Sequence, residues 1–276
     1  MEFQITTQDN ETLHVKQYKA VGNKTVIVAP AVGISQGYYK HIANFLSEAG
    51  YDVITFDYRG ISKSSKVSNP ENCTILNWGK QDLEAVISHV SKHYSNDIYL
   101  IGHSIAGQVF PFAESNYKVK AAYFVASQNL SITNWSGGSK LLVNIFWDLI
   151  IPTFTIFKNP LPAFAYGGTQ SLPYGVAANW RRWGKHKDGA NGSEPDGYKK
   201  YSNIGTPTKF VGFTDDLMFA PVAAVKKLHE VYGVTKKECQ IIDPSKTDLK
   251  EVGHFNFFKK EKKSLWIDVI NWFESV

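Results

Sequence analysis

Short apolar runs alternate along most of this chain with segments whose apolar residues recur at helical spacing, and this alternation constrains the fold more than any other feature. Parallel strands need crossover connections, which helices supply, so the pattern predicts a mostly parallel sheet with helices on both faces. An alternating apolar and polar pattern on either side of Asp9 and Asn10 predicts an antiparallel hairpin ahead of that sheet. The predicted strands are 3–7, 12–18, 25–29, 52–56, 97–101, 119–125, 208–213 and 239–243, and the predicted helices are 38–49, 78–90, 220–232 and 265–273.

The alternation of strands and helices stops between the strands at 119–125 and 208–213. The intervening residues are rich in Trp, Phe, Tyr, Pro and Gly and show no strand–helix rhythm. We therefore expect a first core part over 1–128, an insertion over 129–203 and a second core part over 204–276.

Two stretches of the insertion have a distinctive composition. Residues 141–157 are apolar except for threonines, Asn144 and Asp148. Their length approaches that of a membrane span, but Asp148 and Pro152 near the middle favour a buried or interfacial helix pair. Residues 185–197 are polar and glycine-rich, which predicts a mobile loop.

Composition restricts the class of protein. The 276 residues are 43% hydrophobic and 20% charged, and the mean hydropathy is -0.24. These values exclude a polytopic membrane protein and a disordered chain. The formal net charge of +5 comes from scattered lysines, so we expect no nucleic-acid partner. The first residues lack the basic and apolar regions of a secretion signal, and we expect a cytoplasmic protein with no integral membrane span.

Ser104 lies at the junction between a predicted strand and a short helix. The strand runs directly into the residues GHSIAG at 102–107. A nucleophilic serine at such a junction needs a tight turn, and the residues two before and two after it must be small because strand and helix backbones approach each other there. Gly102 and Ala106 meet this requirement, so the pattern indicates a nucleophile raised above the sheet.

This junction and its partners along the chain resemble the α/β-hydrolase family, and the chain is similar to members of the serine aminopeptidase type. The resemblance implies a mostly parallel eight-stranded sheet flanked by helices, with the insertion as a helical cap over the sheet's carboxyl edge. Ala106 departs from the glycine usual in the family, but it is also small. The segments that carry the resemblance are APAVG at 29–33, FDYRG at 56–60, GHS at 102–104, DD at 215–216 with AP at 220–221, and GHF at 253–255.

His254 is the candidate catalytic base. The resemblance implies a triad in the order nucleophile, acid, histidine, which puts the base near the C-terminus. His254 follows Gly253 in a predicted loop between the last strand and the last helix. The other histidines fall in the hairpin, on helices or in a polar loop, except His103, whose side chain we expect to point away from Ser104.

The candidate acid is Asp216, with Asp215 as the alternative. Counting forward from Pro207 and back from the AP pair at 220–221 places the family's acid at Asp216. Counting from Gly212 with the common Gly-x-x-Asp spacing gives Asp215. Two landmarks favour Asp216, which would hold His254 in the required tautomer. The other carboxylate would then be structural.

Two main-chain amides are candidates for an oxyanion hole. The Ile105 amide lies near the start of the helix that follows Ser104, where a developing negative charge is stabilised. The resemblance implies a second donor in the loop after the strand at 25–29. Pro30 has no N–H, so the donor is Ala31 or Val32, and we choose Ala31.

Two other clusters resemble structural features. In the DYRG segment, Arg59 is expected to pair with a carboxylate and hold loops together. The tryptophans and arginines at 180–183 predict an amphipathic helix with buried indoles and solvated guanidinium groups, although they could also line a substrate pocket.

The expected activity is that of a serine hydrolase acting on an ester, thioester or amide, and a carboxylesterase or lipase is favoured because esters are more reactive than amides. The apolar insertion favours a hydrophobic acyl or aromatic small-molecule substrate. An acyltransferase with the same triad and a non-catalytic binding protein remain open. We expect no cofactor and no metal, since the sequence has no Walker or dinucleotide motif and its two cysteines form neither a disulfide framework nor a zinc site.

Overall fold

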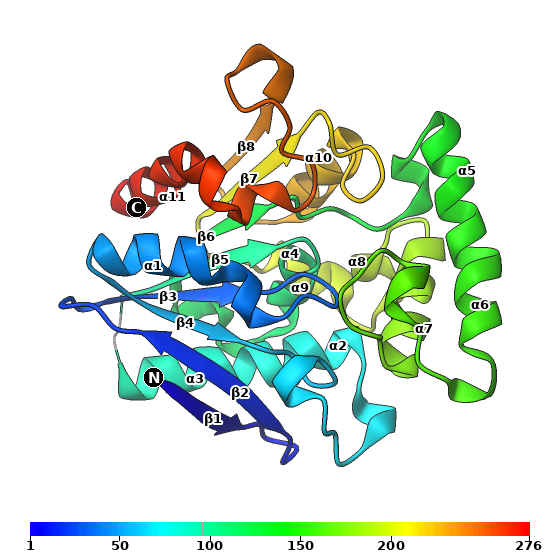
Figure 1. Ribbon diagram of the computed structural model, residues 1–276, viewed down its shortest axis with the longest axis horizontal. Coiled ribbons are helices and arrows are strands. Elements are labelled where there is room, and N and C mark those ends of the chain that lie inside the picture. Colours follow the sequence, from blue (N-terminus) through cyan, green and yellow to red (C-terminus); the bar gives the residue numbers. More distant parts are fainter. Residues whose placement is uncertain (95–96) are drawn as a thin grey trace.

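The computed structural model describes residues 1–94 and 97–276, and within them eight strands form one sheet in the order β1-β2-β4-β3-β5-β6-β7-β8 (Figure 1). β2 pairs antiparallel with both β1 and β4, and the remaining neighbours pair parallel. The predicted opening hairpin and mostly parallel sheet are confirmed. The strands are β1 Glu2–Thr6, β2 Thr12–Tyr18, β3 Lys24–Ala29, β4 Tyr51–Phe56, β5 Asp97–His103, β6 Val119–Val125, β7 Thr208–Phe213 and β8 Lys237–Ile242.

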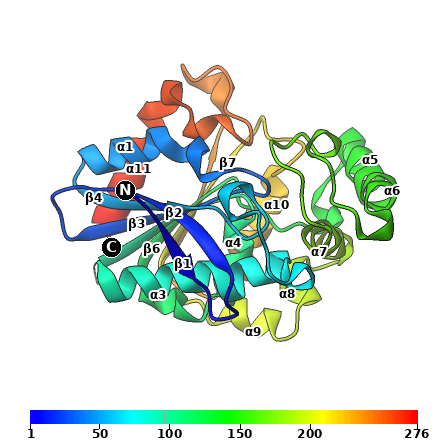
Figure 2. The same ribbon diagram turned by 60° about the horizontal axis from the view of Figure 1, so that its bottom comes forward.

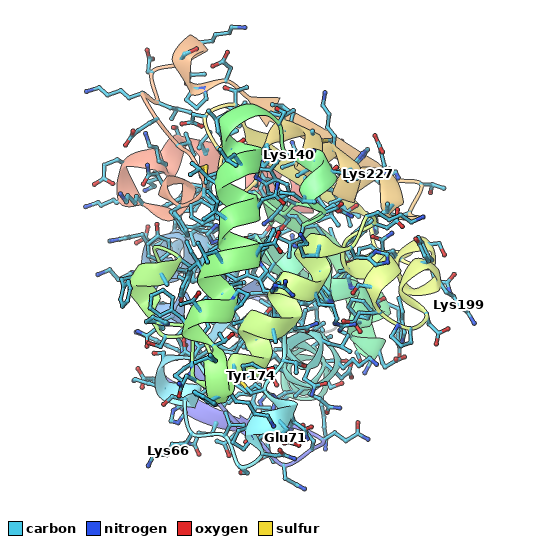
Figure 3. All side chains as sticks on the ribbon, turned by 90° about the vertical axis from the view of Figure 1, so that its right-hand side faces the viewer. Lys66, Glu71, Lys140, Tyr174, Lys199 and Lys227 are labelled. Atoms are coloured by element: carbon cyan, nitrogen blue, oxygen red, sulfur yellow. The ribbon has the colours of Figure 1, made fainter. Side chains whose placement is uncertain are left out.

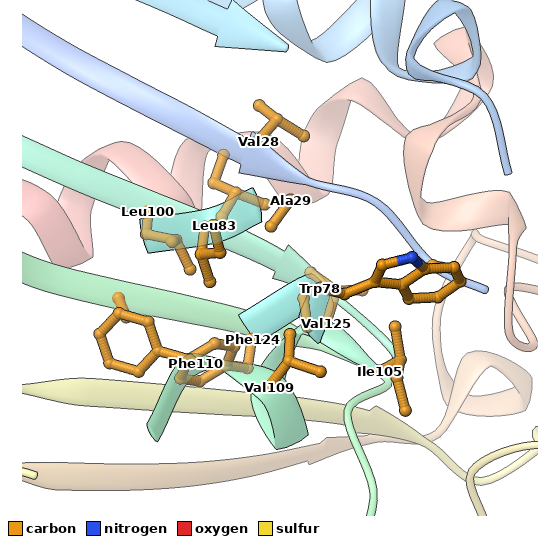
Figure 4. Packing of buried hydrophobic residues seen from close by; sticks show 14 of the residues in the cluster. Val28, Ala29, Trp78, Leu83, Leu100, Ile105, Val109, Phe110, Phe124 and Val125 are labelled. Atoms are coloured by element: carbon orange, nitrogen blue, oxygen red, sulfur yellow. The ribbon is translucent and has the colours of Figure 1, made fainter. Parts of the chain in front are cut away.

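The strand sequences match the places that the strands take in the sheet. β2 lies near the edge and alternates buried and half-buried residues, as expected for a strand with one covered face. β3, β5 and β6 lie in the middle and are buried almost throughout, because helices cover both faces. Figure 4 shows apolar side chains of the central strands packed together with Trp78 and Phe110.

Helices cover the two faces of the sheet. Two neighbouring residues of β6 point to opposite sides: the Tyr123 hydroxyl donates to Asp268 of α11, whereas Phe124 packs against Phe110 and Tyr232. Figure 2 shows α1 and α11 on one side of the sheet and α3 on the other. These helices are α1 Lys40–Glu48, α3 Glu84–His93, which follows a π-helical turn at Trp78–Leu83, α4 Ala106–Val109, α10 Val222–Val231 and α11 Trp266–Glu274, with the short α2 Ile75–Asn77 beside them.

Helices also form most of the segment between β6 and β7, which lies beside the carboxyl ends of the central strands (Figure 1). The Thr169 hydroxyl donates to the carbonyl of Gly33, just after β3, and the side-chain amide of Asn129 donates to the carbonyl of Asp188. The helices are α5 Gly137–Ile145, α6 Ile151–Phe154, α7 Tyr174–Lys185, α8 Ala190–Ser193 and α9 Gly197–Ser202, and a π-helical turn at Phe146–Ile150 joins α5 to α6.

The prediction of a loop over residues 185–197 is wrong for part of this stretch, and its mobility stays a prediction. These residues include α8 and the start of α9, and Glu194 is buried there. Its carboxylate accepts hydrogen bonds from Trp183 and Arg182 of α7 and from the Asn179 amide at 3.2 Å. One polar residue of this stretch is therefore a buried carboxylate whose partners are side chains of α7.

The interpretation of residues 180–183 as an amphipathic helix is confirmed for α7. Trp180 and Trp183 are buried, while the side chains of Arg181 and Arg182 remain about half exposed. Arg59 likewise pairs with carboxylates as expected: it donates to Asp82 at 2.6 Å and to Asp9 at 2.6 Å.

Candidate active site

Ser104 occupies a tight, left-handed turn between β5 and α4. Its φ is 55°, a conformation that costs energy for a residue with a side chain, and its amide donates to the Val125 carbonyl at 2.9 Å. A Cβ at Gly102 would come within 2.7 Å of the Phe124 ring and 3.0 Å of the Ala106 Cβ. The small residues on either side of the serine are therefore required by the close approach of strand and helix.

The structure brings His254 together with Asp216. The His254 Nδ1 lies 2.6 Å from Asp216 Oδ2, and both side chains are almost completely buried. The other carboxylate oxygen of Asp216 accepts from the amides of Phe219 at 3.1 Å and Ala220 at 3.0 Å. Because an ionised carboxylate only accepts hydrogen bonds, the proton lies on Nδ1 and leaves Nε2 free as an acceptor.

Asp215 does not contact the imidazole. Its Oδ2 accepts from the amides of Val252 at 2.8 Å and Gly253 at 3.0 Å. These amides immediately precede His254 in the chain. Asp215 therefore ties down the loop that carries the histidine, while its neighbour holds the ring.

Ser104 and His254 line the same cavity, which has a volume of about 300 Å³. In the part of the chain that the structure describes, no hydrogen bond joins the serine hydroxyl to the imidazole. Such contacts are often long in a site without substrate and shorten when the substrate binds. Both side chains therefore border the same cavity.

The cavity wall is mainly apolar, and much of it comes from the segment between β6 and β7. Trp180 of α7 is one of the lining residues, so this tryptophan both packs in the interior and lines the cavity. The apolar residues that line it include Ile34, Leu130, Trp135, Leu142, Val143, Ile145, Phe146, Trp147, Ile150, Tyr166, Trp180, Met218, Phe219 and Phe255.

Gln128 is a cavity residue that the sequence analysis missed. It is 4% exposed, and its Oε1 has no hydrogen-bond partner among the described residues. A buried amide oxygen without a partner carries a desolvation cost that a ligand donor or a water molecule would remove. The signal available in the sequence was its position shortly after β6, at the edge of the sheet where Ser104 also lies.

A chain of hydrogen bonds behind the site connects the loop after β3 to the histidine loop. The Ala31 amide donates to the Tyr39 hydroxyl at 2.8 Å, and that hydroxyl lies 2.9 Å from His103 Nδ1. His103 Nε2 lies 2.9 Å from the His254 carbonyl, which can only accept, so Nε2 carries the proton and Tyr39 donates to Nδ1.

This chain corrects the choice of Ala31 as an oxyanion donor. An amide has one proton, and that of Ala31 is already donated to Tyr39. Val32, the other residue considered, lines the cavity, and its amide has no hydrogen bond within residues 1–94 and 97–276. The Ile105 amide, directly after Ser104, is unbonded in the same range.

His103 is buried and neutral. Burial is the main reason that its pKa lies well below its ordinary value of 6.5, and the nearby His254 acts in the same direction. A neutral ring is what the hydrogen-bond chain requires, since Nδ1 accepts from Tyr39. As expected, His103 packs behind the site: it does not line the cavity that contains Ser104.

Among the described residues, no group of three or more His, Cys, Asp or Glu side chains is arranged to hold a metal ion. Cys73 and Cys239 are both free thiols.

Comparisons with known proteins point to one fold. Residues 20–138 match the model of a family described as serine aminopeptidase, S33. Comparison with curated protein sequences finds no match. Three similar solved structures are DcsB in complex with its substrate analogue (17% identity, TM-score 0.71, covering 100% of this chain and 98% of that one), an esterase from Exiguobacterium antarcticum (16%, 0.67, 99% and 100%) and a soluble variant of monoglyceride lipase from Saccharomyces cerevisiae with a substrate analogue (13%, 0.69, 98% and 94%).

Proposed function

We propose that this chain, which has the α/β-hydrolase fold, is a serine hydrolase that cleaves carboxylic esters through an acyl-enzyme intermediate on Ser104. The observation that carries the proposal is the 2.6 Å contact between His254 and Asp216 beside a cavity that Ser104 also lines. A serine needs a base to remove its proton, and the base needs an orienting acid. Thioesters and amides would follow the same course.

In the proposed reaction, Ser104 Oγ attacks the carbonyl carbon while His254 Nε2 takes the hydroxyl proton. Asp216 stabilises the positive charge that forms on the imidazole. The amides of Ile105 and Val32 face the negative oxygen of the tetrahedral intermediate. When this intermediate collapses, the bond to the leaving alcohol breaks and His254 returns the proton to the alcohol.

Hydrolysis of the acyl-enzyme completes the cycle. A water molecule loses a proton to His254 Nε2 and attacks the acyl carbon. The bond to Ser104 Oγ then breaks, the proton returns to the serine, and the carboxylic acid leaves. In this reaction the segment 129–203 acts as a cap over the site, and its apolar residues select a hydrophobic acyl chain or an aromatic ester.

The decisive experiment replaces the nucleophile. Ser104→Ala should lower kcat for p-nitrophenyl esters by at least about 10⁴ while leaving the fold intact, because the acyl-enzyme can no longer form. Ser65→Ala, at an exposed serine outside the cavity, is the matched control and should retain full activity. The unchanged chain should be labelled on Ser104 by a fluorophosphonate.

Three outcomes would overturn the proposal. Activity that survives Ser104→Ala would mean that another group is the nucleophile. An intact protein that never reacts with the fluorophosphonate would support a binding role without catalysis. Consumption of the ester with no net hydrolysis when an alcohol or amine acceptor is added would identify an acyltransferase.

A further inference from the structure

The helical run from α5 to α6 is apolar on two opposite sides. Its inner side, with Val143, Trp147 and Ile151, is buried. Leu141, Ile145 and Leu149 follow one another four residues apart and are exposed on another side. We define the apolar face as the exposed large apolar residues of this run and the loop that follows it, which are 38% to 91% exposed: Leu141, Leu142, Ile145, Leu149, Phe154, Ile156, Phe157 and Phe164.

The apolar face lies on an outer side of the molecule. Figure 3 shows the helical run crossing the surface in front of the core, starting near Lys140. Each apolar side of a helix is normally buried against protein or lipid. In a chain that folds as one sheet-based core, this second apolar side has no counterpart among the described residues, so it requires a partner outside them.

Backbone geometry holds an aromatic ring outward at the end of the run. Phe157 has a φ of 57° and is 91% exposed, and Lys158 follows with a φ of 61°. Left-handed backbone is unfavourable for a bulky residue. The turn therefore maintains, at an energetic cost, a ring that contacts water in the isolated chain.

The charge around the apolar face is sparse and mostly positive. Residues 137–170 contain Lys140, Asp148 and Lys158 as their charged side chains. Two of these charges are paired from other elements: Asp148 with Lys185 at 2.7 Å and Arg181 at 3.4 Å of α7, and Lys158 with Glu71 at 3.4 Å. A surface of this kind is attracted to neutral or weakly anionic amphiphiles.

The apolar face continues into the candidate active site. Leu142 and Ile145 are exposed, and both also line the cavity that contains Ser104. Apolar contact therefore extends from the outer surface to the proposed nucleophile. A hydrophobic molecule could move along this path without crossing water.

We propose that the apolar face docks onto a lipid surface, with the α5–α6 run lying in its plane, and that hydrophobic substrates enter the cavity from there. No described helix is long and apolar enough to cross a membrane, so the attachment is peripheral. A second copy of the chain fits less well, because it would cover Leu142 and Ile145, which border the cavity. The entry of substrate rests on the proposed function, whereas the docking does not.

The test measures binding separately from catalysis. Flotation of Ser104→Ala protein with vesicles of phosphatidylcholine, alone or mixed with a minor fraction of phosphatidylglycerol, should show binding to both. The triple change Leu141→Ser, Leu149→Ser and Phe157→Ser removes exposed side chains that do not line the cavity, and it should weaken binding at least about tenfold. In a chain with Ser104 intact, the same triple change should leave turnover of a short, soluble ester unchanged.

The matched control is Tyr117→Ser with Ile267→Ser, which removes exposed large apolar residues outside the apolar face and should leave binding unchanged. A chain that stays in the unbound fraction, or a triple variant that binds as well as the original, would overturn the proposal. A dimer in solution that the triple change dissociates would assign the face to a second copy. Binding without any esterase activity would overturn the proposed function but not the docking.

Discussion

Two adjacent carboxylates, Asp215 and Asp216, show how much one residue of spacing changes a role. Both follow β7, and both accept two backbone amides. Only Asp216 also contacts the His254 ring, at 2.6 Å. The two side chains point in different directions. Asp216 points at the His254 ring, whereas Asp215 points at the main chain just before His254.

The two aspartates should therefore differ in their effect on catalysis. Asp216→Asn should lower kcat by about 10⁴, because an amide no longer holds the imidazole in the required tautomer or stabilises its charge. Asp215→Asn keeps an oxygen that can accept from Val252 and Gly253, and it should lower kcat by no more than about tenfold. Steady-state measurements of kcat for the two variants on one p-nitrophenyl ester test this difference. Equal losses for the two variants would contradict the assignment.

At the scale of elements, Arg59 connects three segments that are distant in the chain. Its side chain is 1% exposed and reaches Asp9 in the opening hairpin and Asp82 in the π-helical turn before α3. Its carbonyl accepts from the Trp78 indole at 3.0 Å. The role is structural, because none of these residues lines the cavity with Ser104.

Removal of this guanidinium should destabilise the protein strongly. Arg59→Met leaves the fully buried Asp82 without its charged partner and should lower the free energy of unfolding by about 3–5 kcal/mol. Adding Asp82→Leu to the same chain removes the uncompensated charge and should recover much of the loss. Urea unfolding of the two variants and the unchanged chain measures this. A double variant no more stable than the single one would contradict the explanation.

At the scale of the whole molecule, burial of a neutral histidine makes stability depend on pH. His103 has a pKa well below 6.5 in the folded chain because it is buried, whereas its pKa in the unfolded chain is the ordinary one. Below pH 6.5 the unfolded chain therefore takes up a proton that the folded chain does not. The contribution to stability is complete above pH 6.5 and is lost as the pH falls toward the folded pKa.

Stability should consequently fall on mild acidification. We expect His103 to contribute a decrease of about 1.4 kcal/mol in the free energy of unfolding for each pH unit below 6.5. Denaturant titrations between pH 7.5 and 5.5 measure the slope. His103→Gln should reduce it by the equivalent of about one proton, and His41→Gln, at a half-buried position on α1, is the control. A slope that His103→Gln leaves unchanged would contradict this account.

Much of this protein could be predicted from local sequence patterns. The strands of the sheet, the covering helices and the turn at Ser104 follow from periodicity and small residues within a few positions, and such signals survive in the linear sequence. His254 and the pair Asp215 and Asp216 could be nominated in the same way, as residues just after strands. Local spacing could not choose between the two aspartates.

The remaining features were decided by contacts between residues far apart in the chain. Asp216 differs from Asp215 because His254 lies beside it, and Ala31 differs from Val32 because its amide already donates a hydrogen bond to the Tyr39 hydroxyl. Residues 185–197 pack against α7 because the buried Glu194 carboxylate accepts hydrogen bonds from its side chains. A sequence states which groups can donate, accept or pack, but only the folded chain determines which of them meet, because burial and hydrogen bonding depend on neighbours that sequence distance does not specify.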